Sequence, residues 1–258
     1  MQWSPKQASY LAHSEAFINI ADGAIRSGKT HAALARFSEE CIKGPAGDFA
    51  VFGKTERTVR RNVVYPLQAL LPGAIKHVQG SGELYIFGRR CHVIGANDAR
   101  AEEKVRGLTL AGAYMNEVTL YPKDVFDQTL ARTLSIEGAR IFADCNPDSP
   151  YHWLNTDYLE ADHPKAYLKR WRFRLPDNPV LPPANVEMLK ALYGPGTLFY
   201  RRNIDGEWVM AEGAVYDQLD IRPGGAHVVT ERPERNAYER VVVGVDYGTS
   251  NPTVFLAA

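Results

Sequence analysis

The chain has 258 residues, of which 45% are hydrophobic and 23% charged, so it can bury a large core and is not expected to be disordered. Thirty basic residues balance thirty acidic ones, so contact with a nucleic acid would need a local patch of charge. Three widely spaced cysteines and the lack of a long apolar segment argue against a disulfide framework, a secretion signal and a membrane span, and we expect a soluble, intracellular protein.

Short strand patterns alternate with helical patterns, and this alternation predicts an α/β fold with a mainly parallel sheet. The elements expected in chain order are a strand in FINIA, a helix over 31–42, a strand in DFAVFGKT, a helix in ERTVRRNVVYPLQALL, two strands around a turn at 88–90, and buried strands in LTLAGAYM and ARIFADC. Ligands of such sheets bind at the carboxyl ends of the strands.

The composition changes near Leu175, where a segment with five prolines surrounds one short helix. We therefore expect a first domain at 1–175 and a linker or lid subdomain at 176–240. A last segment at 241–258 contains a strand that ends at Asp246.

The stretch GAIRSGKT fits the phosphate-binding pattern G-x-x-x-x-G-K-[ST], known as Walker A, between a strand pattern and a helix pattern. Its glycines let backbone N–H groups surround phosphate oxygens, while Lys29 reaches the β- and γ-phosphates and Thr30 binds Mg²⁺. The alternative is a glycine-rich turn in which Lys and Thr occur by chance. The strand pattern before the stretch and the helix pattern after it favour the ATP-binding loop over this alternative. The residues expected to bind the nucleotide are Gly23, Arg26, Ser27, Gly28, Lys29 and Thr30.

Hydrolysis needs an acidic residue at a strand end that holds the waters bound to the metal, and a base that positions the attacking water. Two buried strands offer one, because Asn116-Glu117 follows the first and Asp144 follows the second. We favour Glu117, because its strand precedes a polar loop, whereas Asp144 lies at a later strand end whose Asn146 would sense the γ-phosphate. Asp144 remains the alternative base.

Taken together, the motifs resemble the large terminase subunit of tailed bacteriophages, the ATP-driven motor that packs double-stranded DNA into a preformed capsid. They cover nearly the whole chain: WSPKQASYLAHS, GAIRSGKT, GAYMNEVTLYP, ADCNPDSPYHWL, DNPVLPPANVEMLKALYGPG, NIDGEWVMAEGAVY and VVVGVDYGTSNPT. The resemblance implies a three-layer P-loop NTPase of the additional-strand, catalytic-glutamate class, followed in the family by a ribonuclease H-like nuclease.

The resemblance also assigns roles to individual residues. Gln7 matches the adenine-contacting glutamine, and Arg26 with Lys29 matches the cations that stabilise the transferring phosphoryl group. Glu117 matches the catalytic glutamate, and Asn146 matches the motif that couples hydrolysis to domain movement.

Two departures from the family pattern stand out. Asn116 occupies the position where many relatives have a metal-side aspartate, so it would act on the metal only through a bound water. Asp246 matches the first metal-binding aspartate of the nuclease, but the sequence ends at Ala258, and a two-metal site needs several carboxylates. We therefore expect ATPase but no nuclease activity, as for part of a longer chain or a split gene product.

The partners implied by the resemblance are double-stranded DNA, the portal protein and the small terminase subunit. A homo-oligomeric ring is implied during packaging, with a monomer in solution still possible, in the host cytoplasm and transiently on the procapsid portal. A helicase-like ATPase is the alternative, and a small-molecule P-loop kinase is a third class.

Two arginine-rich segments are candidates for backbone contact with DNA, although a solvated charged face is the simpler reading of each. One is the stretch 168–174, where Arg170, Arg172 and Arg174 alternate onto one side if it is a strand. The other cluster comprises Lys54, Arg57, Arg60 and Arg61. A finger that reaches a neighbouring subunit would come from Arg100, Arg106 or Arg132.

Overall fold

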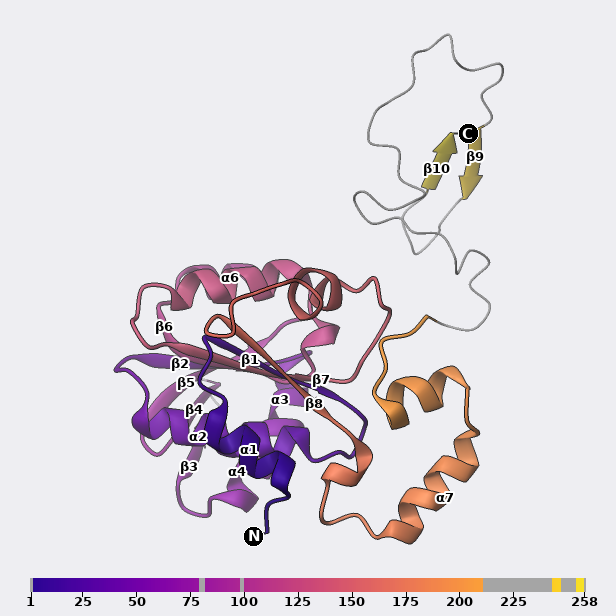
Figure 1. Cartoon of the computed structure of the whole chain (residues 1–258). Helices are drawn as coiled ribbons and strands as arrows, with labels where there is room; N and C mark the ends of the chain where they lie inside the picture. Colours follow the sequence, from indigo (N-terminus) through magenta and orange to yellow (C-terminus); the bar gives the residue numbers. More distant parts are fainter. Residues whose placement is uncertain (1, 79–81, 98–99, 211–242, 247–253, 258) are drawn as a thin grey trace. The chain divides into compact units, whose positions relative to one another are not determined.

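The computed structural model describes residues 2–78, 82–97, 100–210, 243–246 and 254–257 (Figure 1). The chain divides into two compact units, Met1–Glu212 and Gly213–Ala258. The boundary expected at residue 175 therefore lies inside the first unit, and most of the expected lid beyond residue 210 lies outside the described residues.

The first unit is built on an eight-stranded sheet with the order β3-β4-β5-β2-β6-β7-β1-β8. Six neighbouring strands from β5 to β8 are parallel, and β4 pairs antiparallel with both β5 and the edge strand β3. The strands are β1 Ile18–Gly23, β2 Asp48–Gly53, β3 Ile75–Val78, β4 Glu83–Ile86, β5 Arg89–Gly95, β6 Leu110–Met115, β7 Arg140–Cys145 and β8 Leu168–Phe173. The mainly parallel sheet predicted from the sequence is confirmed.

Helices cover both faces of the sheet and make three layers (Figure 1). On one face lie α1 Pro5–His13, α2 Lys29–Lys43, α3 Glu56–Val59, the π-helical turn η1 Arg60–Val64 and α4 Tyr65–Leu70. On the other face lie α5 Arg100–Arg106 and α6 Lys123–Thr133. Short turns follow the later strands: η2 Val118–Leu120, η3 Leu154–Leu159 and η4 Leu175–Asp177.

Strand residues supply the two cores alternately, as the pleat requires. In β7, Phe142 packs toward α2, whereas Ile141 and Ala143 pack toward α6. Because both faces of each central strand are buried, these strands read as almost continuous apolar runs in the sequence.

One local expectation is corrected in the β4–β5 hairpin. The turn consists of Phe87 and Gly88 rather than residues 88–90, and β5 already begins at Arg89. Both turn residues have positive φ, 50° and 79°, which matches the twist that a two-residue hairpin needs.

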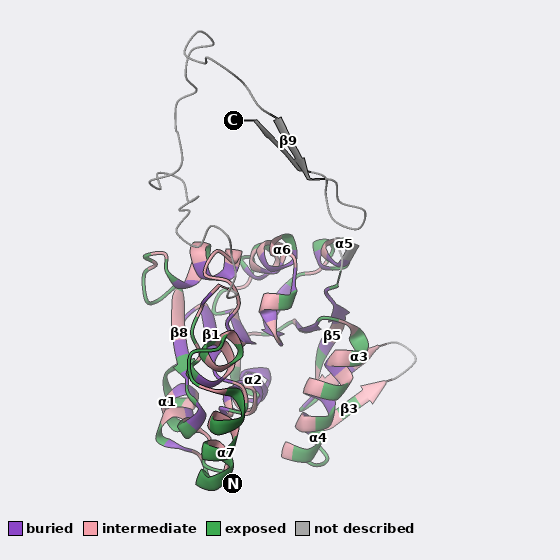
Figure 2. Ribbon diagram, turned by 90° about the vertical axis from the view of Figure 1, so that its right-hand side faces the viewer, coloured by how far each residue is buried: buried purple, intermediate pink, exposed green. Residues whose placement is uncertain are grey.

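The segment after β8 packs back against the start of the phosphate-binding stretch. Leu175 and Ile204 form a small buried cluster with Ala24. This segment contains α7 Pro183–Tyr193 and the π-helical turn η5 Tyr200–Asp205. None of the residues of α7 is buried, and Figure 2 shows the helix on the surface of the unit.

The second unit is described only at two short strands. β9 Val243–Asp246 pairs antiparallel with β10 Val254–Ala257, and Asp246 lies opposite Val254. Over the described ranges, no helix has both the length and the apolar character of a membrane span.

Candidate functional site

The phosphate-binding stretch connects β1 to α2, as predicted. Gly23 has φ of 136°, and a Cβ there would lie 1.9 Å from the carbonyl oxygen of Phe173. Gly28 has φ of 82°, and a Cβ there would lie 2.5 Å from Nε2 of Gln7. Both positions therefore favour glycine for backbone conformation, and Gly23 also needs it for space because the nearby atoms are backbone.

Three segments from elsewhere in the chain hold this loop. The N–H of Ala24 donates to the carbonyl of Phe173 (2.9 Å), and the N–H of Ile25 donates to the carbonyl of Asn203 (2.8 Å). The side-chain amide of Asn178 donates to the carbonyl of Arg26 (2.7 Å). The loop is thus fixed from β8 and from the segment that carries α7 and η5.

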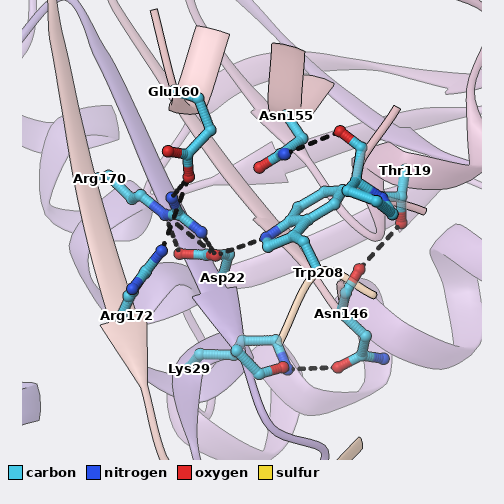
Figure 3. A network of polar contacts seen from close by, with 11 residues as sticks. Asp22, Lys29, Thr119, Asn146, Asn155, Glu160, Arg170, Arg172 and Trp208 are labelled. Atoms are coloured by element: carbon cyan, nitrogen blue, oxygen red, sulfur yellow. Dashed lines mark hydrogen bonds and ion pairs between the residues drawn. The ribbon is translucent and has the colours of Figure 1, made fainter. Parts of the chain in front are cut away.

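Lys29 lies inside the loop with only 6% of its surface exposed. Its Nζ donates to the carbonyls of Gly23 (3.3 Å) and Ala24 (2.9 Å) and to Oδ1 of Asn146 (2.6 Å), a contact drawn in Figure 3. Burial lowers the pKa of the Lys29 ammonium, and the Asp144 carboxylate acts in the opposite direction. An ammonium held by weak carbonyl acceptors in a desolvated loop is suited to phosphate oxygens.

The other loop residues leave groups available to a ligand. Ser27 is fully buried, and its hydroxyl has no hydrogen-bond partner in the described part of the chain. The side chain of Arg26 is exposed, and Thr30 is half-buried in the first turn of α2. A buried hydroxyl without a partner and a glycine cradle fit an oxygen-rich anion such as a nucleotide phosphate.

Gln7 lies next to this loop. Its side chain accepts from the N–H of Ser4 (3.0 Å), which closes a capping box on α1, and its Nε2 donates to the carbonyl of Gly28 (3.2 Å). The structure therefore brings this predicted residue to the phosphate loop, while its proposed contact with adenine stays a prediction.

The two candidate carboxylates turn out to belong to one cluster. β6 and β7 are parallel neighbours with Met115 opposite Ala143, so the next pair in register is Asn116 and Asp144. The Asp144 carboxylate, 1% exposed, accepts from the Glu117 N–H (2.8 Å) and from the Asn116 amide (3.0 Å). It also accepts from the Tyr114 hydroxyl (3.1 Å).

Glu117 is the more accessible of the two acids. It is half-buried, and its backbone is left-handed with φ of 57°. Burial and then the Asp144 carboxylate raise the pKa of Glu117, whereas Arg61, Lys29 and Lys54 lower it. Asp144 is closed off by its three donors, so the geometry favours Glu117 as the residue that can meet a water molecule.

The amide groups around Glu117 complete the polar edge of the sheet. Oδ1 of Asn116 accepts from the amide of Asn62 in η1 (3.2 Å), and the carbonyl of Asn146 accepts from Thr119 (3.4 Å). The Thr30 hydroxyl is an oxygen ligand of the type that Mg²⁺ prefers, and the Asn116 amide oxygen can accept a hydrogen bond from a metal-bound water. The donor set therefore fits the metal ion that the sequence predicts.

Sequence reasoning missed a second buried network behind the phosphate loop. Asp22, fully buried in β1, accepts from Arg170 of β8 (2.6 Å) and from the indole N–H of Trp208 (3.0 Å), as Figure 3 shows. Arg170 also pairs with Glu160 (2.6 Å). An aspartate near the end of a strand that is expected to be buried was the available signal, because a buried charge needs a partner.

The two arginine-rich segments differ in how free their charges are. β8 is a strand as expected, but Arg170 is neutralised by Asp22 and Glu160, and Arg172 lies 3.7 Å from Glu160. In the other segment, Arg57, Arg60 and Arg61 line a hollow of about 910 Å³, and no ion pair involves them within the described residues.

The candidate fingers are held within the chain itself. Arg106 pairs with Glu102 (2.6 Å), and Arg132 donates to the carbonyl of Arg106 (2.9 Å). The side chain of Arg100 lies outside the described residues.

A family model described as the N-terminal part of the T4-like large terminase subunit matches residues 20–223. The chain belongs to the phage large-terminase family. This match includes the phosphate loop, Glu117 and Asn146, and the inserted strand β7 between β6 and β1 agrees with the additional-strand class of P-loop NTPases.

Solved large terminases have the same fold. The large terminase of a thermophilic bacteriophage, in complex with ADP, is 32% identical, with a TM-score of 0.73 over 99% of this chain and 64% of that one. Its complex with ATP-γ-S gives a TM-score of 0.72 with the same identity and coverage. This terminase chain therefore spans just under two thirds of the length of that relative.

A more distant structure supports the fold alone. The large terminase ATPase domain of Thermus phage P74-26 is 17% identical, with a TM-score of 0.61 over 81% of this chain and 94% of that one. Among curated protein sequences, no relative matches this terminase.

Proposed function

We propose that this chain hydrolyses ATP with Mg²⁺ and that hydrolysis drives double-stranded DNA into a procapsid. The observation that carries the proposal is the meeting of the phosphate loop and Glu117 at one edge of the sheet. Lys29 contacts Asn146, and Glu117 is held by Asp144, which lies two residues before Asn146. The structures of the thermophilic phage terminase with ADP and ATP-γ-S support a nucleotide site in this fold.

In this mechanism the loop N–H groups and Ser27 bind the phosphates, and Lys29 with Arg26 stabilises charge on the transferring group. Thr30 would hold Mg²⁺ together with the phosphates, and Asn116 would contact one of its waters; the ion would neutralise phosphate charge. Glu117 orients the attacking water and takes its proton. The raised pKa of Glu117 strengthens it as a base once it is ionised.

ATP hydrolysis would be coupled to domain movement through Asn146 and through the contacts that the phosphate loop makes with the segment 176–210. The Lys29 ammonium cannot keep its 2.6 Å bond to Asn146 unchanged when it turns toward a γ-phosphate. Segment 176–210, which contacts Ala24, Ile25 and Arg26, would act as the lid that responds to the nucleotide.

The proposed DNA surface is the hollow lined by Arg57, Arg60 and Arg61, because these three arginines form no ion pair within the described residues, and Glu56, which also lines the hollow, pairs with Lys104. Backbone contact without base readout suits a motor that moves on any sequence. The portal protein, the small terminase subunit and further copies of this chain in a ring are the proposed partners, at a procapsid in the host cytoplasm.

The catalytic part of the proposal is tested by ATP turnover of the wild type and Glu117→Gln, with and without linear double-stranded DNA and with RNA as control. We expect Glu117→Gln to bind nucleotide normally and to lose at least about 100-fold in turnover. Normal turnover by Glu117→Gln would refute the assigned base. A Glu117-dependent rate that DNA does not change would restrict the proposal to an ATPase.

The DNA surface is tested by a double variant, Arg57→Ala with Arg60→Ala. Removing two phosphate contacts should weaken DNA binding and reduce the slope of log K against log salt by about 2. The matched control is Arg90→Ala, because Arg90 is already paired with Asp48. Equal effects of the double variant and the control on DNA binding would contradict the assignment.

A further inference from the structure

Asp144 makes contacts that the proposed mechanism does not use. It is a fully buried carboxylate at the end of β7, and no ion pair involves it within the described part of the chain. Three donors surround it instead: the Tyr114 hydroxyl, the Asn116 amide and the Glu117 N–H. All three come from β6 or from the turn that follows it.

The contact to Asn116 fixes which way that amide points. An ionised carboxylate only accepts hydrogen bonds, so the NH₂ group of Asn116 must face Asp144. The carbonyl oxygen Oδ1 of Asn116 then faces away from β7, where it accepts from Asn62 (3.2 Å). Asp144 thereby makes Asn116 present an acceptor on the side away from β7.

The contact to Glu117 fixes the backbone that carries the proposed base. Glu117 has φ of 57°, a conformation that residues other than glycine adopt at an energetic cost. Its N–H reaches Asp144 at 2.8 Å in this conformation, and a hydrogen bond to a charged acceptor offsets part of that cost. Without Asp144, the turn after β6 would lose the contact that favours this conformation.

We infer that Asn116 and Asp144 form a functional pair, in which the carboxylate lies at the end of β7 and the amide directly after β6, and that Asp144 is a positioning residue for Glu117. The inference rests on the proposed role of Glu117. It explains the asparagine at position 116: a carboxylate there would face the Asp144 carboxylate without a donor between them.

A set of three variants tests the pair: Asp144→Asn, Asn116→Asp, and the two combined. We expect each single variant to lower kcat for ATP about tenfold or more, with a smaller change in KM, because the base is misplaced while the phosphate loop is intact. The combined variant again places one carboxylate beside one amide. It should recover at least about half of the lost rate on a logarithmic scale, since the two substitutions are in contact and not additive.

Two further measurements separate positioning from general stability. Nucleotide affinity and the thermal midpoint should stay near the wild-type values in the combined variant, and affinity should change less than kcat in the single variants. The matched control is Asp127→Asn. Asp127 lies on α6 and, like Asp144, accepts a hydrogen bond from a tyrosine hydroxyl, that of Tyr158 (2.5 Å). This control should leave kcat unchanged.

Failure of the inference is distinguishable from failure of the proposed function. If Glu117→Gln abolishes turnover but Asp144→Asn and Asn116→Asp leave kcat unchanged, the inference is overturned and the base is retained. If the loss in the combined variant equals the sum of the losses in the single variants on a logarithmic scale, the pairing of Asn116 with Asp144 is also overturned. If Glu117→Gln turns over normally, the proposed function fails first.

Discussion

The two loops that form the candidate site are held in different ways. The phosphate loop after β1 is fixed by backbone carbonyls of Phe173 and Asn203, which come from far along the chain. In the turn after β6, the backbone N–H of Glu117 is held by a buried carboxylate, Asp144, on the neighbouring strand. The conformation of the phosphate loop therefore depends on the close approach of backbone segments. The conformation of the Glu117 turn depends on the register between β6 and β7.

This difference explains why one loop is easier to recognise than the other. A loop that binds phosphate with its own backbone needs glycines at fixed spacing, so its pattern is local in the sequence. A turn that is held by a side chain of another strand leaves no local pattern, because its partner is defined only when β6 and β7 pair.

The largest effect should follow from adding one methyl group to the first loop. In Gly23→Ala the new Cβ would lie 1.9 Å from the Phe173 carbonyl oxygen, so β1 and β8 would have to separate. We expect a loss of about 4 kcal/mol or more of stability together with loss of nucleotide binding. Thermal unfolding and nucleotide titration measure the two effects.

The control for Gly23→Ala is Gly73→Ala. Gly73 also has positive φ, 82°, but nothing lies within 4 Å of its added Cβ, so only conformational strain of about 1 kcal/mol is expected. Similar losses at both positions would mean that close approach to β8 does not hold the loop.

A smaller effect is expected behind the phosphate loop, where Asp22 joins β1 to β8 and to Trp208. Asp22→Asn removes the charge that neutralises the mostly buried Arg170, which should cost about 3 kcal/mol. Chemical denaturation gives the change. Asp148→Asn is the control, because Asp148 pairs with Arg202 near the surface and its loss should cost no more than about 1 kcal/mol. Equal costs would show that the buried network does not stabilise the loop.

The smallest effect should come from Tyr114→Phe, which removes one of the three donors to Asp144 and leaves the other two. We expect a loss of about 2 kcal/mol in the free energy of unfolding, because the lost hydrogen bond ends on a charged acceptor. ATP turnover should fall less than in Asp144→Asn. A larger fall in turnover than in Asp144→Asn would mean that the tyrosine, and not the carboxylate, positions the turn.

Much of the fold could be predicted from the sequence, since the buried parallel strands read as apolar runs and the phosphate loop has a local pattern. From the sequence alone, Glu117 and Asp144 were alternative candidates for the catalytic base, because each follows an apolar strand pattern. The pairing of Met115 with Ala143 places them in one cluster, and no single-strand pattern contains that information. The β8 arginines illustrate the same limit, since their alternation was visible but their partners Asp22 and Glu160 were not.

The central claim is that the phosphate loop binds ATP and that Glu117 is needed to hydrolyse it. The most direct test is to incubate Glu117→Gln with ATP and Mg²⁺, remove free nucleotide, and identify what remains bound. The claim predicts ATP on Glu117→Gln and ADP on the wild type after the same incubation. ADP on Glu117→Gln, formed as fast as on the wild type, would contradict it.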